Sequence, residues 1–333
     1  MAVHTDWRAL YDYMLRGRRV LVTGGAGFIG SHLVETLVHL DADVTVFDDL
    51  SSGRPSNLPD ATNLRLVNGS VLDEAAVAQA VAGVDTVFHL AARVSVPQSV
   101  TDPKAYHDVN ATGTVNVLEA ARRAAVPRFV YSASSSAYGD APEMPKVETM
   151  AERPQSPYAA AKLVGEQYVR AYAACYDIDA ISLRYFNIFG PRQNPHSPYS
   201  GVIAAFSKMI LAGEAPRITG DGSASRDFTY VHNVVHANLL AATLRERTGA
   251  RLGGEVVNVA VGERRTILEL ASNMLRLFDR TDLKPTFAPA RPGDVAHSLA
   301  NLDHAKQVIG FTPIVAFEEG LAETCAWYRQ SLD

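Results

Sequence analysis

A glycine-rich turn between a strand-like segment and a helical segment constrains the fold more than any other feature. Apolar residues 20–22 lead into TGGAGFIG at 23–30, and residues 31–40 have a helical pattern. Glycines at 24, 27 and 30 permit a tight turn and let a pyrophosphate approach backbone N–H groups at the positive end of the helix. The flanking strand and helix make this pattern more specific than three glycines alone. The sequence therefore predicts a dinucleotide-binding βαβ unit.

An acidic residue after the second strand-like segment selects the cofactor. Residues 44–47 end in Asp48, which lies 18 positions beyond Gly30. Its carboxylate can accept hydrogen bonds from both ribose hydroxyls and would repel a 2′-phosphate, so we expect NAD rather than NADP. Arg54 lies too far along the chain to reverse this preference. The alternative is that Asp48 and Asp49 only begin the turn that follows.

Strand-like and helical segments alternate from residue 18 to about residue 134. This alternation predicts an α/β fold with a doubly wound, Rossmann-type parallel sheet covered on both faces. After Arg184 the chain becomes rich in Pro, Gly and Asn, which predicts a smaller, mixed α/β substrate domain. We expect an N-terminal helical extension at 1–17, a dinucleotide-binding domain at 18–186 and about 227–262, and the substrate domain at about 187–226 and 263–333.

Charge and cysteine content exclude several classes of partner. The formal net charge is −5, and no apolar run is long enough to span a bilayer, so we expect neither nucleic-acid nor membrane binding. Cys175 and Cys325 are far apart, and the N-terminus lacks the order of a signal peptide, so a cytoplasmic protein is expected. His232 and His236 have the spacing of a zinc pair, but no HExxH glutamate or nearby cysteine accompanies them. We predict a structural role for them and no metal.

A tyrosine and a lysine four residues apart form the candidate catalytic pair. Tyr158 and Lys162 follow Ser156 and Pro157, which begin a helical segment, so both side chains project from one helix face. Ser134 ends a strand-like segment at the carboxyl edge of the predicted sheet, where such folds bind ligands. A neighbouring ammonium and a positive nicotinamide ring would both favour the phenolate. We therefore expect Tyr158 to act as a base beside Ser134.

Several motifs are distinctive in combination, namely TGGAGFIG with Asp48, HLAA at 89–92, Asn110, SASSSAYG, and Tyr158 with Lys162. Together they resemble the extended short-chain dehydrogenase/reductases, from about residue 18 to near the C-terminus. The segments LRYFNIFGPRQ, GDGSASRDFTYV and RPGDVAHSLAN are similar to the nucleotide-sugar 4-epimerases, most closely the bacterial UDP-N-acetylglucosamine 4-epimerase group. The smaller domain would then bind the nucleotide sugar.

This resemblance implies a reaction and an assembly. Bound NAD⁺ would take hydride from sugar carbon 4 while Tyr158 removes the hydroxyl proton, and the 4-keto sugar would rotate before it is reduced on its other face. Ser134 would assist proton movement, Lys162 would bind the nicotinamide ribose and lower the tyrosine pKa, and Asn110 would support the site. The implied function is interconversion of UDP-N-acetylglucosamine and UDP-N-acetylgalactosamine, with UDP-glucose and UDP-galactose as further substrates, by a homodimer.

The resemblance also implies two sets of binding residues. The cofactor set is Gly24, Gly27, Phe28, Ile29, Gly30, Asp48, Ser70, Val71, Ala91, Asn110, Tyr158 and Lys162. The substrate set is Ser95, Ser134, Ser135, Ser136, Tyr158, Asn187, Val202, Phe206, Arg226, Arg291, Asp294 and Ser298. Ser70 stands where the family usually has an aspartate for the adenine amine. Arg217 and Thr219 also differ from the close relatives near the nucleotide, so base and sugar specificity are open.

Four alternatives remain on the sequence alone. A sugar 4,6-dehydratase would carry an Asp-Glu pair at Ser135 and Ser136, and a decarboxylase would carry glutamate at Ser136, so both are disfavoured. A dehydrogenase that exchanges soluble NADH stays open, as does a silent NAD-binding regulator, which would not need Ser134, Tyr158 and Lys162 together.

Ser298 bears on the choice of sugar. It aligns with a position where, in the family, a bulky tyrosine accompanies restriction to glucose and galactose nucleotides. A serine there leaves room for an N-acetyl group. The alternative is that Ser298 only completes a turn and faces away from the ligand.

Overall fold

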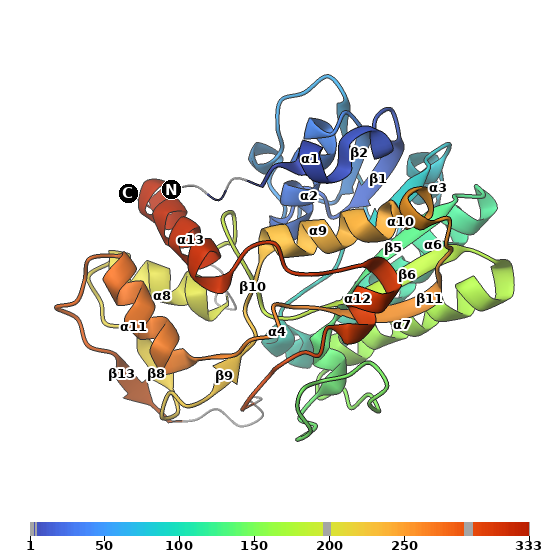
Figure 1. Ribbon diagram of the computed structural model, residues 1–333. Coiled ribbons are helices and arrows are strands. Elements are labelled where there is room, and N and C mark those ends of the chain that lie inside the picture. The colour runs from blue at the N-terminus through green and yellow to red at the C-terminus, as the bar shows by residue number, and fades with distance from the viewer. Residues whose placement is uncertain (1–2, 4, 196–200, 290–295, 333) are drawn as a thin grey trace.

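The computed structural model describes residues 3, 5–195, 201–289 and 296–332 (Figure 1). Its largest element is a seven-stranded sheet with the order β11-β6-β5-β4-β1-β2-β3. Every neighbouring pair is parallel. The strands are β1 (Arg19–Thr23), β2 (Asp43–Asp48), β3 (Leu64–Asn68), β4 (Thr86–His89), β5 (Arg128–Ser134), β6 (Asp179–Tyr185) and β11 (Gly253–Val259). The predicted doubly wound α/β fold is confirmed.

Helices cover both faces of this sheet. One face packs against α2 (Phe28–His39), α9 (Val231–Ala242) and α12 (Asp303–Ile309). The other face packs against α3 (Glu74–Val81), α6 (Gly113–Arg123) and α7 (Pro157–Tyr176). Alternate residues of a strand point to opposite faces. Accordingly, Val20 and Val22 of β1 enter one apolar core and Leu21 enters the other, which explains why the central strands are apolar throughout.

Three small sheets and three helices lie together at one end of the molecule (Figure 1), and all but the β9–β12 pair contribute to a third apolar core. The helices are α8 (Val202–Leu211), α11 (Ile267–Leu277) and α13 (Phe317–Leu332). The strand pairs are β7 (Ile188–Phe189) with β10 (Thr229–Tyr230), β8 (Arg217–Thr219) with β13 (Thr286–Ala288), and β9 (Ser225–Arg226) with β12 (Arg265–Thr266). The domain limits given above remain a prediction.

Short elements complete the chain between these layers. They are α4 (Val96–Thr101), α5 (Pro103–His107), α10 (Leu244–Thr248), η2 (Pro55–Asn57), η3 (Asp108–Thr112) and η4 (Ser135–Tyr138). The η3 segment is a π-helical turn between α5 and α6. Such turns occur often at functional sites, and this one contains Asn110.

The N-terminal residues pack on the body of the protein through α1 (Trp7–Tyr11) and η1 (Asp12–Met14). Trp7, Tyr11 and Leu15 are buried in the core that α2 and α9 share. The Tyr11 hydroxyl donates to the His236 carbonyl over 3.0 Å and lies 2.6 Å from His236 Nδ1. His232 Nδ1 lies 3.1 Å from Thr5 Oγ1. These contacts give both histidines structural partners.

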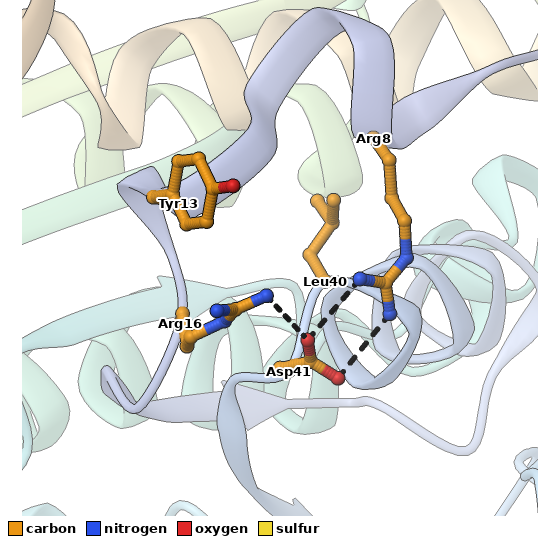
Figure 2. A pocket seen from close by; sticks show the side chains of 5 residues that line it. All are labelled: Arg8, Tyr13, Arg16, Leu40 and Asp41. Atoms are coloured by element: carbon orange, nitrogen blue, oxygen red, sulfur yellow. Dashed lines mark hydrogen bonds and ion pairs between the residues drawn. The ribbon is translucent and has the colours of Figure 1, made fainter.

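Ion pairs also connect this N-terminal segment to the end of α2. Asp41 follows α2 and receives the Arg8 guanidinium at 3.3 Å and the Arg16 guanidinium at 3.5 Å. Figure 2 shows the two arginines converging on this carboxylate beside Tyr13 and Leu40. Because all three charged groups are substantially exposed, these pairs add little to stability. The buried aromatic residues therefore provide most of the attachment.

Within the described parts of the chain, none of the helices combines the length and the apolar character that crossing a membrane requires.

Candidate active site

The glycine turn brings three backbone segments into close contact. Gly24 has φ +70°, and a Cβ there would lie 2.7 Å from the Ala91 nitrogen. A Cβ at Gly30 would collide with the Gly24 carbonyl. Gly27 is the N-cap of α2, so the first backbone N–H groups of the helix, at Phe28 to Gly30, face the turn without helical acceptors. This cradle suits a pyrophosphate.

Asp48 lies at the end of β2, next to the glycine turn. Its Oδ2 accepts from the Ala26 N–H at 2.9 Å and its Oδ1 accepts from the Leu50 N–H at 2.9 Å. Burial raises the Asp48 pKa, and these two bonds oppose the rise. Asp48 therefore shapes both the glycine turn and the turn after β2. A carboxylate has about four lone-pair sites, so Asp48 retains acceptor capacity for ribose hydroxyls.

The other predicted cofactor residues lie around the loop that follows β4. Asn110 is fully buried, and its side chain holds the backbone of Arg93 by accepting from the N–H at 2.8 Å and donating to the carbonyl at 2.9 Å. Ala91 donates its N–H to Thr23 Oγ1 over 3.2 Å. Val71 is buried against Gly113. The structure thus places Ala91 beside the glycine turn and gives Asn110 a direct role in holding this loop.

Two further predicted residues have local structural contacts. Ser70 Oγ accepts from the Leu72 N–H at 3.2 Å in the turn after β3. Ser95 is the N-cap of α4, where its hydroxyl oxygen accepts from the Gln98 N–H at 3.2 Å. The hydroxyl oxygens of both residues are therefore engaged by the backbone.

The predicted catalytic residues come from β5 and α7, which pack together. Ser134 ends β5, and its Oγ accepts from the Ser136 N–H at 3.2 Å and the Ser136 hydroxyl at 2.9 Å. Helix α7 begins beside this edge with Ser156 as its N-cap. Tyr158 is half-buried and interacts through its side chain with Ser134. Ser134, Ser136 and Tyr158 thus form one cluster of hydroxyl groups.

Burial dominates the protonation of the tyrosine and lysine. It raises the Tyr158 pKa, whereas the Ser134 hydroxyl lowers it and Tyr106 raises it further. Burial also lowers the Lys162 pKa to about 7, and the charge of Glu166 opposes that shift. In the protein alone, burial is the largest influence on the Tyr158 pKa and the Ser134 hydrogen bond opposes it. The lowering of the tyrosine pKa by Lys162 stays a prediction. The positive nicotinamide ring would have to supply the additional stabilisation of the phenolate.

Lys162 has a defined position over an aromatic ring. Its Nζ lies 4.4 Å from the centroid of Tyr131, and the Tyr131 hydroxyl donates to the Lys162 carbonyl over 3.1 Å. One helical turn further, Glu166 forms a buried two-bond pair with Arg184, at 2.7 and 2.8 Å. Sequence reasoning missed this pair. The available signals were an arginine inside the apolar strand β6 and a glutamate on the same α7 face as Lys162.

The predicted substrate residues divide into several groups. Asn187 Nδ2 donates to the Ser298 hydroxyl at 3.0 Å and to the Asp227 carbonyl at 2.9 Å. The Ser298 oxygen also accepts from the Asp227 N–H at 3.4 Å. Asn187 and Ser298 are thus brought together. Ser298 thus has the local hydrogen bonds expected of a turn residue, and it also lies beside Asn187, which is predicted to contact the substrate.

The remaining substrate residues lie on α8, on β9, in η4 or between the described segments. Val202 begins α8 and is half-buried, whereas Phe206 is buried in the apolar core one turn later. Arg226 Nη1 donates to the carbonyls of Ser225, at 2.9 Å, and Ala296, at 3.1 Å. Ser135 lies in η4 beside Ser134. Arg291 and Asp294 lie outside the described residues.

The parallel sheet, the glycine turn with its acidic partner, and the Ser-Tyr-Lys cluster at the same sheet edge define an extended short-chain dehydrogenase/reductase. The chain matches the model of the "NAD dependent epimerase/dehydratase family" over residues 20–260. It therefore belongs to that family, as the sequence motifs predicted. Family membership makes NAD the cofactor, and the cradle at Gly24 with the buried Asp48 fits it.

The curated proteins that are similar to this chain are named for more than one reaction. A UDP-glucose 4-epimerase of Mycolicibacterium smegmatis is 40% identical over 316 residues, which cover 93% of this chain and 98% of the relative. A dTDP-glucose 4,6-dehydratase of Streptomyces niveus is 35% identical over 324 residues, which cover 94% of this chain and 93% of the relative. Sequence identity alone therefore leaves the reaction open between epimerase and dehydratase.

Solved structures share the whole architecture. A UDP-N-acetylglucosamine 4-epimerase from Methanobrevibacter ruminantium, in complex with UDP-N-acetylmuramic acid, has a TM-score of 0.89 and 39% identity and covers 95% of this chain and 99% of its own. A Thermus thermophilus UDP-glucose 4-epimerase in complex with NAD has a TM-score of 0.83 and 35% identity, covering 93% of this chain and 99% of its own.

Proposed function

We propose that this chain is an NAD-dependent UDP-sugar 4-epimerase that interconverts UDP-N-acetylglucosamine and UDP-N-acetylgalactosamine and also accepts the UDP-glucose and UDP-galactose pair. The observation that carries the proposal is the hydroxyl cluster of Ser134, Ser136 and Tyr158, with Lys162 one turn along α7. This cluster can remove and return a single proton at one sugar hydroxyl, which is what epimerisation through a ketone requires.

Each side chain has a separate task in this reaction. The glycine turn at Gly24 and Asp48 would hold NAD⁺, which would supply reversible hydride transfer at sugar carbon 4. Tyr158 Oη accepts the proton of the carbon 4 hydroxyl and gives it back after the sugar has rotated. The Ser134 oxygen already accepts from Ser136, so its single hydroxyl hydrogen is donated either to Tyr158 Oη or to the sugar oxygen. Lys162, when protonated, stabilises the phenolate electrostatically and can bind the nicotinamide ribose.

The residues that follow Ser134 at this edge of the sheet disfavour a reaction in which the sugar loses water or carbon dioxide. Elimination of water from a 4-keto sugar needs a second acid and base near carbons 5 and 6. Ser135 and Ser136 occupy the two positions after Ser134, and neither serine titrates in the working pH range. A dehydratase or decarboxylase is therefore disfavoured, although dehydratases occur among the relatives.

The choice of sugar rests on Ser298 and its partner. Asn187 and Ser298 are joined by a 3.0 Å hydrogen bond, and the small serine side chain leaves volume that a tyrosine would fill. An N-acetyl group needs such volume because close-packed pockets do not absorb extra atoms without strain. Arginine forks suit diphosphate oxygens, which gives Arg226 and Arg291 their proposed role. Asp294 would bind the uridine ribose, and Val202 and Phe206 would border the base.

The outer face of α7 supports the homodimer that we include in this proposal. A groove there is lined by Pro154, Ala160, Leu163, Val164, Gln167, Tyr168 and Ala171. Tyr168 is 43% exposed despite its size, and contiguous exposed apolar surface often marks an interface. Light scattering of the purified holoenzyme tests this: twice the chain mass supports the dimer, and a single chain mass contradicts it.

We also place the enzyme in the cytoplasm. Cys175 and Cys325 are both free thiols, and Cys175 is exposed. Exposed thiols persist in reducing compartments. Fractionation of the source cells tests this placement.

The reaction is tested by giving the pure protein a panel of UDP-sugars and separating the epimers by chromatography. The proposal expects the 4-epimer to form from each of the four sugars named. A 4-keto-6-deoxy sugar would instead identify a dehydratase, and loss of carbon dioxide from a UDP-uronic acid would identify a decarboxylase.

A further inference from the structure

His89 is a buried titratable residue at the end of β4 that the proposed chemistry does not use. Both ring nitrogens have partners. Nδ1 lies 2.7 Å from Thr23 Oγ1 at the end of β1, and Nε2 lies 3.0 Å from Thr114 Oγ1 at the start of α6. Both threonines are also buried. The ring therefore connects the strand that leads into the glycine turn with the helix that follows the π-helical segment.

The neighbouring hydrogen bonds determine which ring nitrogen carries the proton. Thr114 Oγ1 donates its hydrogen to the Asn110 carbonyl at 2.7 Å, so its oxygen must accept from His89 Nε2–H. Nδ1 is then an acceptor for the Thr23 hydroxyl. The Thr23 oxygen in turn accepts from the Ala91 N–H at 3.2 Å.

Both ends of the chain of bonds act on the same short loop. Thr23 holds the N–H of Ala91, and Asn110 holds the N–H and carbonyl of Arg93 at 2.8 and 2.9 Å. This loop, 91–93, begins two residues after His89 itself. It also lies against the glycine turn, because a Cβ at Gly24 would reach within 2.7 Å of the Ala91 nitrogen. The position of the loop therefore depends on His89 from two sides.

The environment keeps the ring uncharged. Burial and the charge of Lys162 lower the His89 pKa to about 3. The ring is stacked on Tyr131, with centroids 5.7 Å apart and an interplanar angle of 24°. Lys162 also lies beside Tyr131, with its Nζ 4.4 Å from the ring centroid. A charged His89 would therefore oppose the charge of Lys162, whereas a neutral ring does not.

We propose that His89 is a positioning residue of the cofactor site, which, as the neutral Nε2–H tautomer, sets loop 91–93 against the glycine turn and so slows NAD release. It acts through Thr23 on the Ala91 side and through Thr114 and Asn110 on the Arg93 side. The inference rests on the cofactor roles proposed for Ala91 and Asn110. It does not depend on which sugar is the substrate.

Three substitutions separate the two hydrogen bonds of the ring, which we call the Thr23 arm and the Thr114 arm. His89→Asn places an amide oxygen near the Nδ1 position and keeps an acceptor for Thr23. His89→Gln reaches the Nε2 position with an amide donor for Thr114 but leaves Thr23 without its acceptor. His89→Leu removes both arms. Release is measured on each purified holoenzyme by exchange of bound NAD with isotopically labelled NAD.

The expected pattern is specific to the positioning role. Release from His89→Gln and His89→Leu is expected to be at least about tenfold faster than from wild type, since an unsatisfied buried hydroxyl disturbs the Ala91 contact. Release from His89→Asn, which loses only the Thr114 arm, should be faster than from wild type but slower than from His89→Leu, because Thr114 keeps its own hydrogen bond to the Asn110 carbonyl. Equal rates in wild type and all three variants would overturn the proposal, and so would release from His89→Asn that is as fast as from His89→Leu.

A second measurement reads the tautomer directly. In a long-range ¹⁵N–¹H spectrum of the histidine-labelled holoenzyme, the ring whose signals are missing from His89→Leu should have a protonated Nε2 and a bare Nδ1 near neutral pH. A protonated Nδ1, or double protonation, at that ring would contradict the proposal. Neither experiment uses a sugar, so failure of the epimerase assay would leave this inference standing, and its own failure would leave the proposed reaction untouched.

Discussion

Replacing Lys162 with methionine should stabilise the fold while it removes activity. An ordinary lysine has a pKa of about 10.4, whereas burial lowers the Lys162 pKa to about 7. This difference of about three pKa units corresponds to roughly 4 kcal/mol of unfavourable free energy when the buried amine is charged. Methionine is uncharged and of similar length, so it removes that cost without opening a cavity.

The substitution also loses a favourable contact, which reduces the gain. The Lys162 ammonium lies 4.4 Å from the Tyr131 ring centroid, and such a cation–π contact stabilises by about 2 kcal/mol when desolvated. We therefore expect a net increase of about 2 kcal/mol in the free energy of unfolding below pH 7. Activity should fall because the phenolate of Tyr158 loses its neighbouring charge.

The pH dependence gives the sign of the effect. Between about pH 7 and 10.4 the unfolded chain keeps a proton on Lys162 that the folded chain has released, so wild-type stability rises with pH in this window. The advantage of Lys162→Met should therefore be greatest below pH 7 and shrink as the pH rises.

Urea unfolding of the NAD-free proteins at several pH values between about 6 and 9.5 measures this difference. Lys306→Met, at an exposed position on α12, is the matched control and should change stability little at any pH. A Lys162→Met protein that is less stable than wild type below pH 7 would refute the reasoning. So would an advantage that does not vary with pH.

Three further substitutions test the site. Tyr158→Phe keeps the ring and removes the ionisable oxygen, so epimerase turnover should fall by about 10²–10⁴-fold with unchanged thermal stability; near-normal turnover would exclude Tyr158 as the base. Ser136→Ala removes a hydrogen bond to Ser134, so kcat/KM should fall about two- to tenfold, and the acidic limb of its pH profile should move to higher pH. Ser136→Thr should restore the value of kcat/KM and the position of that limb. An unchanged pH profile in Ser136→Ala would contradict this role. Ser298→Tyr should depress epimerisation of the N-acetylated pair selectively, as measured by competing substrates, while Ser298→Ala, which adds no bulk, should keep the wild-type preference; equal losses on both sugar pairs would show that Ser298 does not select by size.

Local patterns in the sequence account for the elements that were predicted well. The glycine turn, the alternation of apolar strands and helices, and the position of Asp48 each depend on neighbours within one βαβ unit, so spacing alone determines them. Tyr158 and Lys162 share a face because they lie one helical turn apart. The start of their helix could be read from Ser156 and Pro157.

Contacts between distant segments could not be predicted in this way. The pairs formed by Arg184 with Glu166 and by His89 with Thr114 join residues on different elements, and their partners are fixed only when the layers pack. The large effect of burial on the Tyr158 pKa was not predicted for the same reason, since burial is a property of the whole fold. The hydrogen bond from Ser136 to Ser134 depends on the tight η4 turn, which the run of serines does not reveal.

The central claim is that one binding event both oxidises and reduces the sugar, with no exchange of cofactor. The most direct measurement is to incubate the purified holoenzyme with UDP-N-acetylglucosamine, without added NAD or NADH, and to follow the sugar nucleotides by chromatography and NADH in solution by absorbance. We predict that UDP-N-acetylgalactosamine accumulates to a constant ratio over many turnovers while no NADH is released. Absence of the epimer, or release of NADH in proportion to the sugar consumed, would contradict the account.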